Sequence, residues 1–271
     1  MQVQTIDDVI QALDNILDWA WHEKSRLGYF AALYRRVTRS VRDGIAQNQF
    51  ENGPLMEKLD VVFAGRYLQA FEQFRSGQEP TLSWQVAFRA GRSRSPIVVQ
   101  QLLAGINAHI NLDLGIAAAT VAPGEQLASL KTDFDQINAV LAGEVGIVEK
   151  EIAKISPLIG LLEKFGLKTE TSIINFSLDE ARNFAWLHAQ KLAGAAPGQL
   201  NTMIAALDAE AAAIGKLVAS PPFLVRLALL PIRIFETSNV HHVLDVLTGG
   251  QSAAPSATKR DAKPDAKKAG A

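Results

Sequence analysis

Four polar residues, Asn107, His109, Asn111 and Asp113, occupy alternate positions inside the longest apolar segment of the chain, residues 97–121 (IVVQQLLAGINAHINLDLGIAAATV). Two of them, His109 and Asp113, are four residues apart, and this spacing places both on one face of a helix. An imidazole and a carboxylate on one face can bind Zn²⁺ or iron together, or the carboxylate can orient the imidazole as a general base. Alternatively, Asp113 hydrogen-bonds His109 inside the core and satisfies both side chains. This pair is the first candidate for catalysis.

A metal ion on this helix needs further ligands from other helices, as in the metal sites of helical bundles. Asp60 is one possible ligand, because the apolar run that follows it is expected to draw it inward, and Glu23 is another. Other donors that the chain offers are Asp133, Asp135 and His188. The candidate metal ligands are His109, Asp113, Glu23 and Asp60. Whether they hold a divalent cation such as zinc or iron stays open.

A second polar pair, Asn107 and Asn111, also has four-residue spacing and points to nearly the opposite side of the helix. Amide side chains can clamp the backbone of a neighbouring helix or hydrogen-bond a ligand, and structural clamping is favoured. A buried polar group without a partner costs roughly 1–3 kcal/mol. Both pairs therefore require partners from other elements.

Arg182 lies on the predicted helix 177–193, for which Ser177 is the expected N-cap. Its guanidinium can neutralise Asp113 or Asp60 inside the core, or hold an anionic substrate, and a structural ion pair is favoured. The candidate substrate-binding residues are Asn107, Asn111 and Arg182.

Apolar residues recur with helical period through most of residues 1–248. The segments that show this period are 5–26, 29–45, 55–74, 84–90, 97–121, 127–154, 177–193, 200–218, 223–235 and 240–247. No strand-like alternation, fixed-period repeat or linker interrupts them. The sequence therefore predicts one all-α domain of about eight to ten helices, residues 1–248, with segment 97–121 buried at its centre.

The composition narrows the possible functions. The chain is 48% hydrophobic with a net charge of −1, which argues against general nucleic-acid binding. It has no cysteine, so disulfides, thiolate metal sites and a cysteine nucleophile are excluded. Signatures of phosphate loops, dinucleotide-binding folds, serine-hydrolase elbows and zinc proteases are also missing. Residues 249–271 carry five basic and two acidic residues and no bulky apolar side chain, which predicts a disordered basic tail.

Two apolar segments raise the question of membrane contact. Segment 97–121 has the length of a membrane span, but Asp113 in its middle costs ~2.5–3.5 kcal/mol on insertion, so a buried core helix is favoured. Segment 223–235, with Arg226 and Arg233, can dock on the core, lie on a membrane surface or form an oligomer contact, and core docking is favoured. The N-terminus shows no signal-peptide pattern, so the expected location is the cytoplasm. The oligomeric state stays open.

Four strings of the sequence occur together and in the same order in one known family. They are SRLGYFAALYRRVT (25–38), LDVVFAGRYLQAF (59–71), LLAGINAHINLDLGIA (102–117) and ARNFAWLHAQKL (181–192). The chain thereby resembles the bacterial family DUF5995, over roughly residues 5–245, and the Asn-Ala-His-Ile-Asn-x-Asp-Leu string is the most specific element. The resemblance implies a single helical domain and adds weight to the polar residues of segment 97–121 and to Arg182. It implies no reaction, because the function of the family is unknown.

Two hypotheses about function follow from these residues. In the first, the chain is an enzyme or binding protein for a small molecule, with His109 as metal ligand or general base and Asp113 as its partner. Arg182 would then hold an anionic group and the asparagines would position the ligand. In the second, the chain is a non-catalytic interaction or scaffold protein, and the same polar residues fix helix packing.

Overall fold

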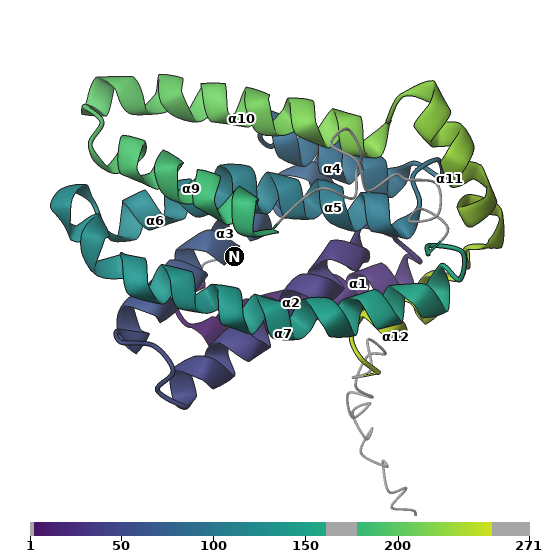
Figure 1. The fold of residues 1–271 in the computed structure, drawn as a ribbon, viewed down its shortest axis with the longest axis horizontal. Coiled ribbons are helices and arrows are strands. Elements are labelled where there is room, and N and C mark those ends of the chain that lie inside the picture. The colour runs from purple at the N-terminus through teal and green to yellow at the C-terminus, as the bar shows by residue number, and fades with distance from the viewer. Residues whose placement is uncertain (1–2, 161–177, 251–271) are drawn as a thin grey trace, which may run out of the picture.

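The computed structural model describes residues 3–160 and 178–250, and these are organised almost entirely as helices (Figure 1). The eleven α-helices of this part of the chain are α1 Ile6–His22, α2 Gly28–Ala46, α3 Gly53–Arg75, α4 Leu82–Arg92, α5 Val98–Ala108, α6 Gly115–Val121, α7 Lys131–Ile155, α9 Leu178–Ala193, α10 Pro197–Ala219, α11 Phe223–Phe235 and α12 Val240–Leu247. A π-helical segment, η1 His109–Leu114, joins α5 to α6, and a 3₁₀ segment, η2 Gly124–Leu130, precedes α7. No strand occurs among these residues, so the predicted all-α class is confirmed.

Local sequence signals set several helix ends. Thr5 and Asp8 form a capping box at the start of α1, in which each side chain accepts a hydrogen bond from the backbone N–H of the other. The side chain of Asn52 caps the start of α3, and Pro54 occupies the first turn of that helix. The expected N-cap Ser177 lies outside the described residues, as does nearly all of the predicted tail 249–271.

The segment α5–η1–α6 is the central helix of the fold. In Figure 1, α9 and α10 lie along one side of it and α1, α2 and α7 along the other. It contacts α2, α3, α4, α9 and α10 directly. Residues 98–121 form the one helix in the described part of the chain that is long and apolar enough to cross a membrane, but 78% of its most apolar stretch is buried inside the fold. The central position predicted for this segment is therefore confirmed.

Two glycines let neighbouring helices approach the central helix closely. A Cβ atom on Gly105 would lie 2.6 Å from Cδ2 of Phe30 on α2. A Cβ atom on Gly115 would lie 2.8 Å from the backbone oxygen of Ala185 on α9. Backbone cannot move aside as a side chain can, so Gly115 sets the distance between α6 and α9.

Replacement of Gly115 by alanine should lower the free energy of unfolding by about 1–3 kcal/mol, because α9 must shift to admit the methyl group. The matched control is Gly65→Ala on α3, where an added Cβ meets no atom within 4 Å and alanine has the better helix propensity. Urea denaturation of both variants checks the prediction. Equal stability of the two variants would contradict the close contact between α6 and α9.

Candidate functional site

At the centre of the fold, side chains from three helical elements converge on the carboxylate of Asp113, which is only 1% exposed. Arg66 Nε on α3 donates to Oδ1 over 2.7 Å, and Trp84 Nε1 on α4 donates to Oδ2 over 2.8 Å. His109 Nδ1 lies 3.4 Å from Oδ2, within η1 itself. A buried carboxylate is stable only when it is paired and hydrogen-bonded, and here these three donors meet that need.

The π-helical turn η1 contains both His109 and Asp113. The sequence predicts an uninterrupted α-helix here, and the four-residue spacing brings the two side chains to the same side in either geometry. A π-helical turn is rare and is found disproportionately at functional sites. Its position at the polar string, between two α-helical segments, therefore marks this part of the central helix as specialised.

His109 is enclosed by aromatic rings and is 3% exposed. The ring of Phe63 stacks on its imidazole with centroids 3.5 Å apart and planes 8° apart, and the ring of Tyr34 meets it edge-on at 4.5 Å. Burial lowers the pKa of His109, while the hydrogen bond and charge of Asp113 act in the opposite direction. The imidazole is therefore neutral at pH 7.

The hydrogen-bond pattern of His109 fixes its tautomer. Because the carboxylate of Asp113 can only accept, the hydrogen of the neutral imidazole lies on Nδ1 and leaves Nε2 as an acceptor. Among the residues that the structure describes, Nε2 has no hydrogen-bond partner, although it is buried. A buried acceptor without a donor is unusual in a folded protein and calls for an explanation.

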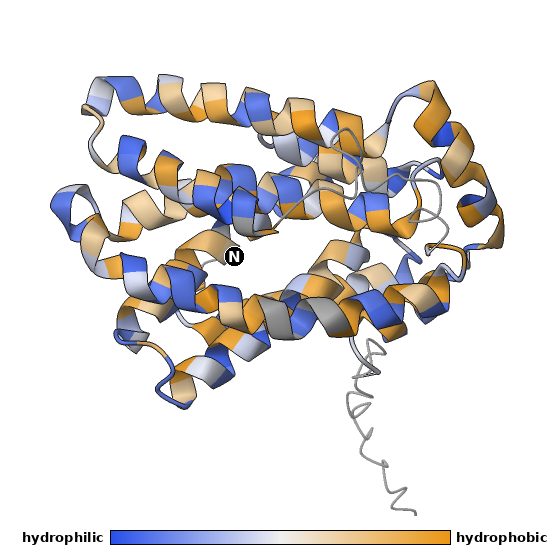
Figure 2. Cartoon of the chain, viewed as in Figure 1, coloured by the Kyte–Doolittle hydropathy of each residue, from blue (hydrophilic) through white to orange (hydrophobic). Residues whose placement is uncertain are grey.

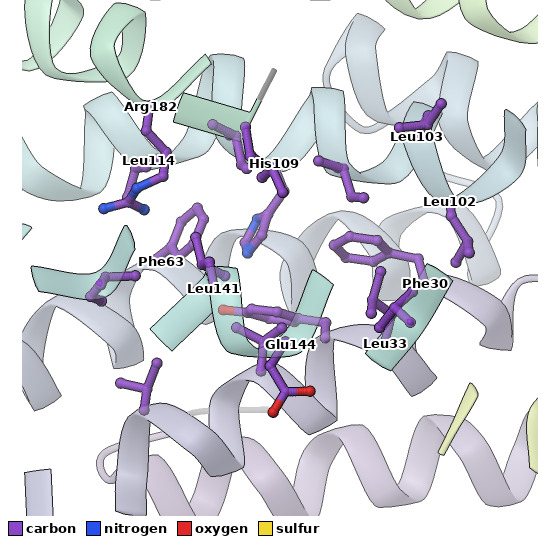
Figure 3. A pocket seen from close by; sticks show the side chains of 18 of the residues that line it. Phe30, Leu33, Phe63, Leu102, Leu103, His109, Leu114, Leu141, Glu144 and Arg182 are labelled. Atoms are coloured by element: carbon purple, nitrogen blue, oxygen red, sulfur yellow. The ribbon is translucent and has the colours of Figure 1, made fainter. Parts of the chain in front are cut away.

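A cavity of about 490 Å³ lies beside His109 (Figure 3). Its walls are mostly aliphatic and aromatic side chains of α2, α3, α5, η1 and α7. The charged and polar side chains among its lining residues are Tyr34, Asp60, His109, Glu144, Glu149 and Arg182. Figure 3 shows His109 between Phe63 and Phe30, with the carboxylate of Glu144 at the lower edge. The volume is that of a typical small-molecule site.

Asp60 on α3 is the second unusual group in the cavity wall. It is 7% exposed, and in the described part of the chain its Oδ2 has no hydrogen-bond partner. Burial, with a smaller contribution from the negative charge of Glu57, raises the pKa of Asp60 from 3.8 to about 7. The inward position expected for Asp60 is therefore confirmed, and the carboxyl group changes its charge near neutral pH.

The two asparagines of the central helix form a clamp on the side away from Asp113. Asn107 Nδ2 donates to the backbone oxygen of Ala211 on α10 over 2.8 Å. Asn111 Nδ2 donates to Asn107 Oδ1 over 2.9 Å. These contacts match the structural alternative considered for this pair, because they tie the central helix to α10.

Arg182 on α9 contacts helix α7. Its Nε donates to Asn138 Oδ1, and its terminal nitrogen donates to the backbone oxygen of Phe134. Its guanidinium carbon also lies 4.5 Å from the centre of the Phe134 ring. Arg182 therefore holds α9 against α7 at the edge of the cavity. The guanidinium beside Asp113 is that of Arg66, not that of Arg182.

The candidate metal ligands do not form one coordination site. Glu23 is exposed at the C-terminal end of α1, whereas His109, Asp113 and Asp60 are buried. Asp133 accepts the backbone N–H groups of Glu51 and Asn52 and so fixes the loop before α3. In residues 3–160 and 178–250, no three His, Asp or Glu side chains converge as metal ligands do. The predicted metal site of His109, Asp113, Glu23 and Asp60 is thus not supported by the donor geometry.

Sequence reasoning missed Arg66 and Trp84, which complete the Asp113 site. A signal for Arg66 exists in the sequence: it follows Phe63 by three residues, so both lie on one face of an apolar helix. An arginine on such a face needs a buried acid, and Asp113 lies within the longest apolar segment of the chain. No comparable signal exists for Trp84, because a tryptophan in a core helix needs no acidic partner to be expected there.

Replacement of Asp60 by asparagine should change how stability depends on pH. Between pH 3.8 and about 7, folded Asp60 keeps a proton that the unfolded chain has released, so its contribution to stability falls as the pH rises through this range. The amide of the substituted asparagine has no charge to bury. Above pH 7, the free energy of unfolding of Asp60→Asn should therefore be higher than that of the wild type by a few kcal/mol. The difference follows from ~1.4 kcal/mol per unit of pKa difference.

Chemical denaturation at several pH values from acid to mildly alkaline measures this effect. The control variant is Glu79→Gln, which neutralises an exposed carboxylate in the loop before α4 and should leave the profile unchanged. If the stability of the wild type and that of Asp60→Asn depended on pH in the same way across the whole range, the pKa of Asp60 would not be raised, and the prediction would be wrong.

Comparison with known proteins gives one result. No curated protein and no solved structure matches the chain. Residues 6–221 match the family described as "Family of unknown function (DUF5995)". This segment contains the central helix, Asp60, Arg66, Trp84 and Arg182, and it ends before α11, somewhat earlier than the resemblance read from the sequence. The chain belongs to the DUF5995 family.

Proposed function

We propose that this protein binds a small, mainly apolar molecule that carries a hydrogen-bond donor, a hydroxyl or an amine, in the cavity beside His109. One observation carries the proposal: two buried acceptors, His109 Nε2 and Asp60 Oδ2, lack donors within the described residues, and both residues line the same apolar cavity. The aliphatic and aromatic walls favour an apolar body. The two acceptors favour a donor group on that body.

Hydrogen bonds to a ligand would offset the cost of burying these two atoms. A buried polar atom without a partner costs about 1–3 kcal/mol, and a donor from the ligand would remove that cost. A neutral imidazole accepts from a hydroxyl group or an amine. Asp60, with its pKa of about 7, pairs best with an amine when it is ionised. Binding of a hydroxyl ligand should therefore depend mainly on His109, whereas binding of an amine ligand should depend mainly on Asp60.

General-base chemistry on the same ligand is the second candidate function. The observation that favours it is the alignment of Asp113, His109 Nδ1 and a free Nε2, in which the carboxylate orients a neutral imidazole. Nε2 can then accept a proton from the donor group of the ligand, and Asp113 stabilises the resulting imidazolium. The scaffold alternative draws its support from the asparagine clamp and from Arg182, which all act in helix packing.

A matched pair of probes tests donor recognition. Para-octylphenol and octylbenzene differ by one hydroxyl group, and para-octylaniline replaces that hydroxyl with an amine. The wild type should bind para-octylphenol more tightly than octylbenzene by about fivefold, equivalent to ~1 kcal/mol for one hydrogen bond. His109→Leu should abolish this preference while retaining octylbenzene, as measured by competition with a fluorescent apolar dye.

The control variant is Glu149→Gln, which neutralises an exposed carboxylate at the cavity wall and should keep the preference. Equal affinity of the wild type for the two probes would contradict donor recognition, and the lack of any binding would contradict the cavity as a ligand site. These probes test binding alone, because a proton that Nε2 takes from the hydroxyl returns when the probe is released and leaves its mass unchanged.

A further inference from the structure

Helix α11 leaves most of its large apolar side chains in solvent. Only two of its residues, Leu229 and Ile232, are buried, and they pack on Ile97 at the start of α5. Six large apolar residues of α11 are exposed, with exposed fractions from 44% for Leu230 to 76% for Leu224. The exposed set on α11 is Phe223, Leu224, Leu227, Leu230, Ile234 and Phe235. The sequence favours docking of this segment on the core. Only the face of α11 that carries Leu229 and Ile232 docks in this way, and the opposite face is exposed.

The exposed residues form a continuous stripe. Phe223, Leu227, Leu230 and Ile234 follow one another at spacings of four, three and four residues, which keeps them on one face of the helix. The stripe lies at the end of the molecule where α10 gives way to α11 across a 56° bend, and Figure 2 shows α11 there as mostly hydrophobic, interrupted by hydrophilic residues. Contiguous exposed apolar surface of this kind marks a contact site.

The charged side chains of α11 itself have one sign. Arg226 and Arg233 are exposed on α11, seven residues apart and thus on one side of the helix, and Lys216 is exposed near the end of α10. The sequence of α11 contains no acidic residue, although the chain as a whole has a net charge of −1. After α12 the sequence continues with five basic and two acidic residues in 251–271. The stripe is therefore an apolar surface with a basic border.

We propose that α11 docks this protein on the surface of a membrane that contains anionic lipids. An amphipathic helix with aliphatic and Phe side chains on one face and arginines beside them is the form that binds the boundary between lipid headgroups and acyl chains. The arginines face the anionic headgroups, which attract basic residues near the surface. A second copy of this chain would present the same arginines, and like charges facing one another across an interface oppose association.

The position of α11 also connects this surface to the cavity. Val99 and Ile159 pack against the cluster that Leu229 and Ile232 of α11 form with Ile97, and both residues line the cavity beside His109. An apolar ligand dissolved in the bilayer would therefore be delivered close to its binding site. This connection rests on the proposed ligand-binding function, whereas membrane docking does not depend on it.

Sedimentation with lipid vesicles tests the docking. The full chain should bind vesicles of phosphatidylcholine with phosphatidylglycerol about tenfold more tightly than vesicles of phosphatidylcholine alone, and added salt should reduce the difference. Leu227→Glu places a charge in the middle of the exposed stripe and should lower binding by about tenfold or more. The matched control is Leu187→Glu on α9, at a position of similar exposure (49% against 55% for Leu227), which should bind as the wild type does.

The double variant Arg226→Gln and Arg233→Gln should lose most of the preference for phosphatidylglycerol and keep the binding that phosphatidylcholine supports. Equal binding of wild type and Leu227→Glu would overturn the proposal, because the basic tail would then account for any attraction. Size-exclusion chromatography measures the oligomeric state of the same variants. A wild type that forms dimers, does not sediment with either vesicle and becomes monomeric in Leu227→Glu would show that the stripe joins two copies of the chain, and would equally overturn it.

Discussion

The buried charge of Asp113 is the constraint on which the centre of this fold depends. A carboxylate that is 1% exposed requires donors, and the chain supplies them from α3 (Arg66), from α4 (Trp84) and from the same π-helical turn η1 (His109). Loss of one partner of a buried ion pair typically costs about 3–5 kcal/mol, so α3 and α4 are held in one position relative to the central helix. Hydrophobic contacts stabilise the same helices, but they specify position less strictly than a charge does.

This arrangement also determines the state of His109. Asp113 accepts from Nδ1 and so leaves Nε2 as an acceptor, while the rings of Phe63 and Tyr34 keep the imidazole buried and neutral. On the other side of the central helix, Asn107 and Asn111 are held by α10 and by each other. The four polar residues from Asn107 to Asp113 thus comprise a hydrogen-bonded clamp of two asparagines, a fully hydrogen-bonded carboxylate and one imidazole with an unused acceptor. The unused acceptor, beside a cavity, is what points to a ligand.

Helical periodicity and the spacing of polar residues were sufficient to predict the all-α class, the buried central helix and the opposite directions of the two polar pairs. The inward position of Asp60 also followed from its apolar neighbours. The partners could not be predicted in the same way, because Arg66 and Asp113 are 47 residues apart and their contact depends on how helices pack. Arg182 illustrates the problem: nothing in the sequence indicates that its guanidinium lies against Asn138 and Phe134 of α7. The exposure of α11 depends equally on packing, since an apolar sequence alone is typical of a core helix.

The protonation state of His109 is the most direct test of this account, and nitrogen NMR spectroscopy of the labelled imidazole measures it. Neutral pH should show Nδ1 protonated and Nε2 unprotonated, because Asp113 accepts from Nδ1 and burial disfavours the imidazolium. Saturation with para-octylphenol should shift the Nε2 resonance, as expected when that atom gains a hydrogen-bond donor. An imidazolium, or a neutral ring with its hydrogen on Nε2, would contradict the account, because His109 would then have no free acceptor to offer a ligand.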